Sequence, residues 1–376
     1  MTQSPMTHSM TSTLRTFVAV AFLALSASAG AQTAVPEIPF DSNVDAVKTG
    51  VDLYLGEVGG VGQNSKGNIF VYTRTGHPYA TLGDNRTFLR NGSKLYEFDK
   101  TGRFVRELGQ MSYGFNMAYG LRVDPQDNVW TVDLAANQVV KFAPDGSIAL
   151  VLGRKPEAIG VRPPPPPAPG ATPGPGGGGG GFGGAAPGPP GSGVPGSGLV
   201  RPTDVAWDKA GNIYISDGIG NNNRVVKLAP DGRFIKHWGA TGAGEGQFNG
   251  AKSIAIDAQG NVYVADLGNK RIQVFDGEGT YKAQFTGVGT PQTMCMTTGA
   301  TQYLYIAHSG DPDGMDDATI YKVRLDGTVV GKFGSAGKLP KEFSLVNSID
   351  CRNENELLIG EMANWRVQKV TLKAAR

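Results

Sequence analysis

Short runs of alternating apolar and polar residues recur along most of the chain, and turn residues separate each run from the next. Residues 260–275, which read GNVYVADLGNKRIQVF, contain two such runs on either side of a turn. Alternation with a period of two predicts strands, and a turn rich in Asn and Gly between them predicts a β-hairpin. A lone hairpin is only marginally stable in water, so it needs further strands to pack against.

The same hairpin pattern recurs at residues 127–142, 211–228 and 355–370, and weaker copies lie at 67–71 and 303–307. A further predicted strand precedes each copy, and in most cases another follows it. A four-stranded unit of roughly 40–50 residues is typical of a β-propeller. We therefore predict an all-β fold, a six-bladed β-propeller of four-stranded antiparallel blades around a central channel.

The two ends of the repeat array complement each other. The sixth repeat, residues 346–372, ends without a fourth strand, and the apolar segment 51–55 has no blade of its own. We expect this N-terminal segment to form the missing strand and close the ring, because closure removes exposed strand edges.

The N-terminus has the features of a secretory signal peptide. Arg15 is followed by an apolar run at 17–25 and by small residues at 29–31, so we expect residues 1–31 to be removed after Ala31. The run is too short to span a bilayer, so we expect no membrane span. The mature protein is then periplasmic or extracellular.

One segment interrupts the propeller. Residues 155–200 are dominated by Pro and Gly and contain little that a core could bury, so we expect a disordered insertion. The lead-in strand and blades one and two lie in residues 32–154, and blades three to six lie in 201–376. We interpret both parts as one domain. The insertion joins the outer strand of blade two to the inner strand of blade three, and it could shield the channel mouth.

Charge and cysteine content restrict the function classes. The net charge is only +2 and the pattern has no basic stripe, so nucleic acid is not an expected partner. The two cysteines, Cys295 and Cys351, lie on predicted inner strands of adjacent repeats. Export would allow them to pair, but we favour two buried thiols that act as small apolar residues.

Polar residues that repeat in several blades are interpreted as part of the scaffold. A carboxylate ends the second strand of four blades, and an Arg begins the third strand of three. We expect the carboxylate to cap the turn and to pair with the Arg. The residues are Asp133, Asp217, Asp266 and Glu361, with Arg224, Arg271 and Arg366.

Function is expected where the blades differ, at the start of each inner strand beside the channel. The differing residues there are Tyr119, Thr203, Lys252, the pair Thr293 and Met294, and Asn347. In blade one, Arg74 interrupts the repeat and is a candidate catalytic residue. If the protein is an enzyme, Tyr119 and Lys252 are candidates as well. Lys252 and Arg74 would make the channel mouth cationic and suited to a small anionic or peptide ligand. The alternative is that each is solvated or paired, with Asp204 as the partner of Lys252.

The sequence has no established metal-binding or nucleophile motif, and one acidic loop is the only candidate for a metal site. No Cys and His spacing of the zinc type, no phosphate-binding Gly loop and no nucleophile elbow occur, so zinc is not expected. An acidic loop after His308 could hold calcium, although a solvated loop is the simpler interpretation. Its carboxylates are Asp311, Asp313, Asp316 and Asp317. His77 also lies in a loop, and His237 is expected to be structural.

Two stretches resemble the NHL family of six-bladed propellers. They are GNVYVADLGNKRIQVF at 260–275 and GNIYISDGIGNNNRVVKLAPDGRFIKHWG at 211–239. Within that family the chain resembles the lyase that cleaves peptidyl-α-hydroxyglycine to a peptide amide and glyoxylate. The resemblance covers most of residues 56–372 outside the insertion, and it is closest at 202–248.

The resemblance implies an active site that this chain lacks in large part. The lyase family holds zinc with three His, and the matching positions here are Tyr119, Lys252 and Asn347. The family's catalytic Tyr falls at Ile219. One of its two active-site Arg residues falls at Leu267, and only the other, Arg74, is kept.

Two further departures concern the scaffold of that family. An Asp associated with its calcium site falls at Ser348, and its stabilising disulfides have no matching cysteines here.

Two hypotheses about function follow from the sequence. The favoured one is an exported, non-catalytic propeller that binds a small anionic ligand, a peptide or a protein. The alternative is a lyase-like enzyme with a degenerate or altered site.

Overall fold

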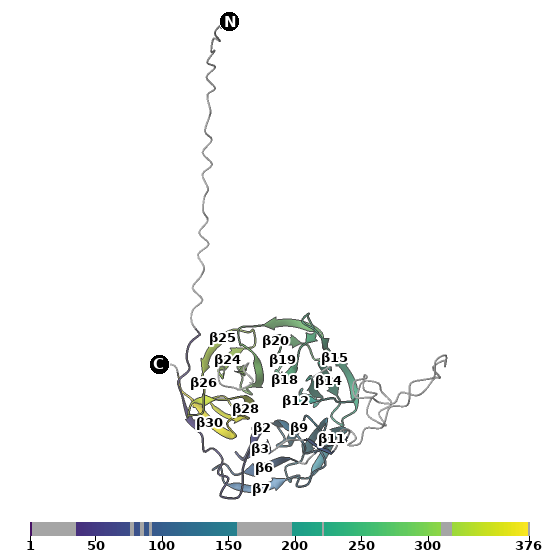
Figure 1. The fold of residues 1–376 in the computed structure, drawn as a ribbon, viewed down its shortest axis with the longest axis vertical. Helices are drawn as coiled ribbons and strands as arrows, with labels where there is room; N and C mark the ends of the chain where they lie inside the picture. Colours follow the sequence, from purple (N-terminus) through teal and green to yellow (C-terminus); the bar gives the residue numbers. More distant parts are fainter. Residues whose placement is uncertain are drawn as a thin grey trace, which may run out of the picture. The chain divides into compact units, whose positions relative to one another are not determined.

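The computed structural model describes residues 1, 35–75, 79–82, 86–89, 92–155, 198–219, 222–309 and 318–374. Residues 35–376 form one compact unit. Six four-stranded antiparallel blades surround a central axis (Figure 1), and none of the described residues is helical. The predicted six-bladed propeller is confirmed.

Each blade runs from an inner strand at the axis to an outer strand at the rim. Blades one and two consist of β2 (Glu57–Gln63), β3 (Ile69–Arg74), β6 (Ser93–Phe98) and β7 (Phe104–Leu108), then β8 (Ala118–Val123), β9 (Val129–Asp133), β10 (Gln138–Phe142) and β11 (Ile148–Gly153). Blades three and four consist of β12 (Pro202–Trp207), β13 (Ile213–Asp217), β14 (Arg224–Leu228) and β15 (Phe234–Trp238), then β18 (Ala251–Ile256), β19 (Val262–Asp266), β20 (Arg271–Phe275) and β21 (Tyr281–Phe285).

Blade five follows the same order, and blade six takes its outer strand from the N-terminal part of the chain. They consist of β22 (Pro291–Met296), β23 (Tyr303–His308), β24 (Ile320–Arg324) and β25 (Val329–Phe333), then β28 (Val346–Asn353), β29 (Glu356–Glu361), β30 (Arg366–Leu372) and β1 (Phe40–Asn43). Three small two-stranded pairs lie in connections: β4 (Tyr79–Leu82) with β5 (Arg86–Leu89), β16 (Ala240–Thr241) with β17 (Gln247–Phe248), and β26 (Ser335–Ala336) with β27 (Glu342–Phe343).

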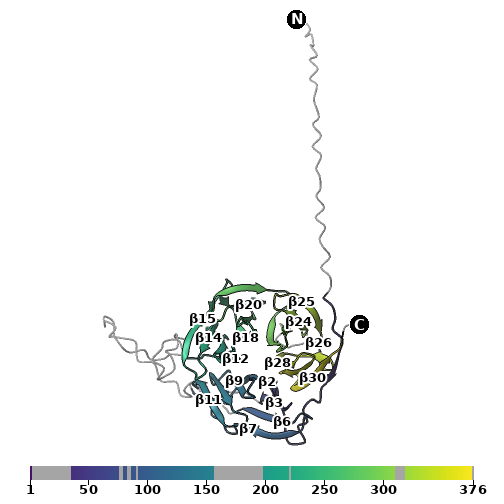
Figure 2. The ribbon, with the colours of Figure 1, turned by 180° about the vertical axis from the view of Figure 1, so that it is seen from behind.

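An N-terminal strand closes the ring as predicted, but it is not the predicted segment. β1 pairs antiparallel with β30, with Phe40 opposite Leu372, and the two strands lie side by side in both views (Figures 1 and 2). The Phe40 ring packs 5.2 Å from that of Phe333, which anchors this short strand. Residues 51–55 form no strand, and the assignment of the closing strand to them is wrong.

Leu55 has another role, shared by one residue in every blade. The residue two positions before β2, and the residue three positions before each of the other inner strands, is buried in the gap to the preceding blade. A buried Leu or Phe side chain contributes about 1.5–3 kcal/mol in such a place. These residues are Leu55, Phe115, Leu199, Phe248, Val288 and Phe343.

The repeated carboxylates have the predicted structural role. Asp266 accepts hydrogen bonds from Arg271 Nε at 2.8 Å, from Asn269 Nδ2 at 2.8 Å and from the backbone N–H of Asn249 at 2.7 Å. Glu361 and Asp217 pair in the same way with the Arg that begins their third strand. The interpretation of this set as scaffold is confirmed.

Cys295 on β22 and Cys351 on β28 form a disulfide. The interpretation as two buried thiols is therefore wrong. The inner strands of blades five and six lie next to each other and bring the two Cα atoms to 5.9 Å, within the range that a disulfide spans. The register between these strands cannot be derived from the sequence alone, so the sequence leaves the pairing open.

Several predictions lie outside the described residues. They concern the signal segment, most of the Pro/Gly insertion, His77 and the carboxylates at 311–317. Within the described part, no helix is long and apolar enough to cross a membrane. His237 lies on outer strand β15, and burial lowers its pKa, with Arg224 adding to the effect.

Candidate ligand-binding site at the bulge end

Each inner strand carries a β-bulge at the same position near its start. A bulge places an extra residue opposite the neighbouring strand and re-aims its side chain. We call the end of the propeller where the inner strands begin the bulge end. The bulged residues, in blade order, are Gly59, Tyr119, Thr203, Lys252, Gln292 and Asn347.

The structure therefore brings four of the five predicted site residues to one ring around the axis. Tyr119, Thr203, Lys252 and Asn347 occupy equivalent bulge positions in blades two, three, four and six. In blade five the bulged residue is Gln292, so the predicted pair Thr293 and Met294 lies two positions beyond the equivalent pair and is wrong. The bulge shifts the register there, and the sequence pattern does not show it.

Lys252 is buried in this ring, with 4% of its surface exposed. Its Nζ lies 3.7 Å from the centroid of the Tyr119 ring, which is cation–π distance. It also donates a hydrogen bond of 2.9 Å to Asn347 Oδ1. The predicted alternative, an ion pair with Asp204, is not formed, because Asp204 pairs with Arg122 instead.

Asn347 ties the ring together. Its Nδ2 donates to the backbone oxygens of Gly59 at 2.7 Å and Tyr119 at 2.6 Å, while its Oδ1 also accepts from Gln292 Nε2 at 3.2 Å. One side chain of blade six thus contacts blades one, two, four and five. Thr203 is less central: its Oγ1 bonds to Ser216 and to the backbone oxygen of Ala251.

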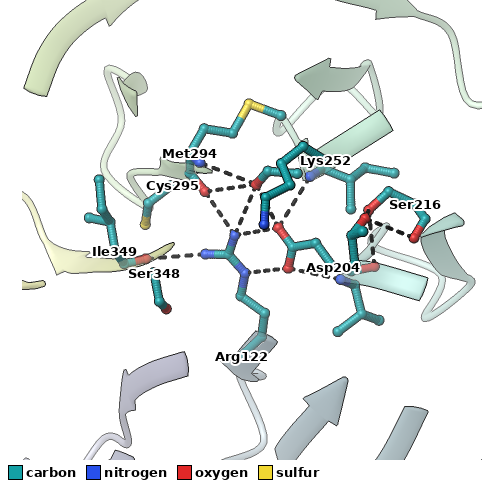
Figure 3. A network of polar contacts seen from close by, with 12 residues as sticks. Arg122, Asp204, Ser216, Lys252, Met294, Cys295, Ser348 and Ile349 are labelled. Carbon is teal, nitrogen blue, oxygen red and sulfur yellow. Dashed lines mark hydrogen bonds and ion pairs between the residues drawn. The ribbon is translucent and has the colours of Figure 1, made fainter. Parts of the chain in front are cut away.

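A second polar layer lies deeper in the channel and is centred on Arg122 (Figure 3). Arg122 makes a bidentate ion pair with Asp204, at 2.9 Å from Nε and 2.6 Å from Nη2. It also donates to the backbone oxygens of Met294 at 2.8 Å and Ile349 at 3.2 Å. The guanidinium of blade two therefore contacts blades three, five and six.

Sequence reasoning missed Arg122, although a signal was present. At the equivalent inner-strand position the other blades have small residues or an acid, which leave room for one long side chain. These residues are Gly62, Ala206, Ala255, Cys295 and Asp350. A charged residue at a position where its counterparts are small indicates an interior ion pair.

The two layers close the channel. The cavity between them has a volume of only about 10 Å³, which is room for one water molecule. The predicted mouth residues thus come together but enclose no space for a larger ligand. That they bind one stays a prediction, and it would require Tyr119 to move.

The environment of Lys252 makes a pH-dependent contribution to stability. Burial holds the pKa of Lys252 well below its ordinary value of 10.5, and Arg74 adds to the effect while Asp204 opposes it. Between the folded pKa and 10.5 the unfolded chain binds more protons than the folded chain. The free energy of unfolding therefore rises with pH in that window.

Replacing Lys252 with Met should remove this contribution. We expect Lys252→Met to be about 1 kcal/mol more stable than wild type at pH 7, since a buried charge is exchanged for an apolar chain of similar length. The difference should shrink as the pH rises towards 10. Burial raises the pKa of the neighbouring Tyr119, so it does not titrate in this range. Urea unfolding at several pH values tests this, and parallel pH profiles would contradict it.

Arg74, the fifth predicted residue, lies apart from the closed channel. It ends β3, and its side chain pairs with Glu57 through Nε. Its Nη1 lies 3.4 Å from the backbone oxygen of Ala118, and its Nη2 lies 3.7 Å from Met362 Sδ. The Nη1 contact is longer than a normal hydrogen bond to oxygen, and the thioether sulfur is a weak acceptor, so the outer part of the guanidinium is weakly satisfied.

Arg74 lines a cavity of about 800 Å³ between blades six and one, which we call the seam cavity. A volume of this size suits a small-molecule ligand. Its lining is mainly apolar, with Arg74, Glu57 and Arg366 as charged members. The other residues are Val44, Val47, Thr49, Leu53, Tyr54, Leu55, Gly56, Thr75, Met117, Trp365 and Val367.

Exposed large apolar side chains distinguish the two ends of the propeller. Outside the outer strands and residue 1, five of them among the described residues lie in connections at the bulge end. The tight polar turns of the opposite end have none in the described part. Exposed apolar side chains of this kind suit a binding surface. The residues are Tyr54, Met111, Tyr113, Leu339 and Trp365, and Val51 is exposed in the segment that leads from β1 to β2.

The sequence profile of the NHL repeat matches residues 248–275, which span the inner strand and central hairpin of blade four. The other five blades repeat this architecture. The chain is an NHL-repeat β-propeller. NHL repeat-containing protein 3 of Mus musculus is 40% identical over 194 residues, which is 50% of this chain and 46% of that protein.

This NHL-repeat propeller is also homologous to amidating enzymes. Peptidyl-glycine alpha-amidating monooxygenase of Mus musculus is 29% identical over 258 residues, covering 64% of this chain and 23% of that protein. Peptidyl-alpha-hydroxyglycine alpha-amidating lyase 1 of Drosophila melanogaster is 29% identical over 200 residues, covering 50% of this chain and 30% of that protein. The chain thus spans less than half the length of each of these relatives.

The positions that the lyase resemblance assigns to zinc do converge in space, but their side chains do not fit zinc. Tyr119, Lys252 and Asn347 meet at the axis from alternate blades. They supply a phenol ring face, an amine and an amide where zinc prefers imidazole, thiolate or carboxylate. In the described part of the chain, no three His, Cys, Asp or Glu side chains are grouped to hold a metal.

Proposed function

We propose that this protein is an exported NHL-repeat propeller that binds a small anionic or peptide ligand at its bulge end, with Arg74 as the anion contact, and that it is not an enzyme. The observation that carries the proposal is the seam cavity, which holds Arg74 and has space for a ligand. The axis, where the lyase resemblance would place catalysis, is filled by side chains. We therefore place the ligand site in the seam cavity and not at the channel mouth.

Electrostatics support an anion at this position. Arg74 and Lys252 act on each other through space, as the lowered pKa of Lys252 reflects after the larger effect of burial. Glu57 neutralises Arg74 only in part, because the Glu57 side chain is 43% exposed and pairs through a single oxygen. A ligand carboxylate could bind the free face of the guanidinium in a bidentate manner.

Removing the Arg74 guanidinium tests the proposal. Wild type should gain thermal stability from at least one of acetate, succinate and N-acetyl-alanine, and Arg74→Gln should lose that gain. Arg103→Gln is the matched control, since it removes an equal charge from an exposed turn at the opposite end. A panel that shifts no unfolding midpoint in wild type, or shifts Arg74→Gln equally, would refute the proposal.

A lyase-like activity is the second candidate, and homology together with Arg74 favours it. Ile219 and Leu267 stand where the resemblance requires a Tyr and an Arg, so this activity would have to use other groups. Stoichiometric zinc in the purified protein with glyoxylate release from an α-hydroxyglycine peptide would establish the lyase. We expect neither.

Export remains part of the proposal. The apolar N-terminal run and the disulfide both suit an oxidising compartment outside the cytoplasm. The mature protein should begin at Gln32, which mass spectrometry of the protein from its native host would show. Retention of residues 1–31 would contradict export by this signal.

A further inference from the structure

Trp365 has a backbone conformation that its side chain disfavours. Its φ is +54°, in the left-handed region, and it directly precedes the third strand of blade six. The equivalent residues of blades two, three and four are Asn137, Asn223 and Lys270, with φ of +55°, +40° and +54°. Asn tolerates this region well, whereas a bulky aromatic residue there is an outlier that points to a functional role.

Trp365 also stands where a ligand could contact it. It lines the seam cavity and is 63% exposed, and Tyr54, which lines the same cavity, is 77% exposed. The other three Trp residues are buried to a much greater degree, and Trp130 and Trp207 pack on each other. Two exposed aromatic rings on one cavity supply a large, rigid, apolar contact area.

The rest of the cavity lining is largely apolar, and its charged members are Arg74, its ion-pair partner Glu57, and Arg366. Leu53, Leu55 and Val367 line it together with Met117, and Arg74 contributes the guanidinium. The Arg74 side chain is only 13% exposed, so an anion bound to it would be largely shielded from water. An ion pair in such a place is stronger than one at the surface.

We infer that the seam cavity selects a small amphipathic carboxylate, whose planar apolar group stacks on Trp365 and Tyr54 while its carboxylate binds Arg74. This inference rests on the proposed function, in which Arg74 is the anion contact. It adds the class of ligand and assigns Trp365 as the residue that determines specificity. The turn itself would be less strained with Asn at this position. We therefore infer that the indole side chain of Trp365 is there for ligand binding.

Three probes and one variant test this inference by isothermal titration calorimetry on the full chain. The probes are 2-naphthylacetate, 2-naphthylacetamide and acetate, which separate the ring from the charge. The variant is Trp365→Asn, which installs the residue that blades two and three have at this turn. It should raise the unfolding midpoint, so a loss of binding cannot be ascribed to misfolding.

Wild type should bind 2-naphthylacetate at least tenfold more tightly than acetate, because acetate lacks the ring that stacks. It should also bind 2-naphthylacetate at least tenfold more tightly than the amide, because the amide lacks the charge that pairs with Arg74. Trp365→Asn should lose about tenfold towards 2-naphthylacetate and nothing towards acetate. Equal binding of the first two probes, or full binding by Trp365→Asn, would overturn the inference. Acetate binding that depends on Arg74 would then leave the proposed function standing. If no carboxylate binds wild type, both this inference and the proposed function are refuted.

Discussion

Replacing Arg122 with Met should lower the free energy of unfolding by about 3 kcal/mol, since removing one partner of a buried pair leaves the other charge uncompensated. Asp204 would keep only Ser253 Oγ, at 2.6 Å, and backbone N–H donors as partners. Its side chain is 6% exposed, so water cannot replace the guanidinium.

A double-mutant cycle separates the ion pair from packing. Arg122→Met combined with Asp204→Leu should recover at least half of the lost stability, because two apolar groups replace both charges. Guanidinium unfolding of the wild type, the two single variants and the double variant gives the coupling energy. A single variant within about 0.5 kcal/mol of wild type would show that the channel network does not stabilise the ring.

Removing the disulfide should have an effect of similar size. The bond joins inner strands of adjacent blades across 56 residues of sequence, and closing a loop of this length contributes about 4 kcal/mol by restricting the unfolded chain. We expect the double variant Cys295→Ala and Cys351→Ala to unfold roughly 7 °C below the oxidised wild type. Calorimetry measures the difference.

Reduced wild type is the internal control for this prediction. It should unfold close to the double variant, because both lack the crosslink while keeping the blades otherwise intact. Oxidised and reduced wild type that unfold at the same temperature would contradict the prediction. The repacking of β22 against β28 would then hold blades five and six together without the bond.

The fold follows from the sequence because the hairpin pattern repeats and each copy constrains the others. The asymmetric features do not repeat. β1 contains only four residues, and its packing on Phe333 depends on contacts more than 290 residues away in the chain. The segment 51–55 alternates more strongly, so the sequence pattern predicts it, wrongly, as the closing strand. Cys295 and Cys351 needed the register between blades, which no local pattern carries.

The candidate site likewise has features that the sequence predicts and features that only the structure shows. Comparing equivalent positions identified Tyr119, Thr203, Lys252 and Asn347, and the structure brings them to one ring. The comparison could not show that Lys252 is covered by the Tyr119 ring, since both the bulge and the burial depend on the closed ring. Trp365 was passed over because the hairpin turns were treated as scaffold, and its left-handed backbone is visible only in the structure.

The position of a bound ligand tests the central claim most directly. A crystal of the protein soaked with 6-bromo-2-naphthylacetate would locate the bromine by its anomalous scattering. We expect a bromine peak in the seam cavity between Trp365 and Leu53, with the carboxylate at Arg74. A peak at the axis above Lys252, with the Tyr119 ring displaced, would contradict it and return the ligand site to the channel mouth.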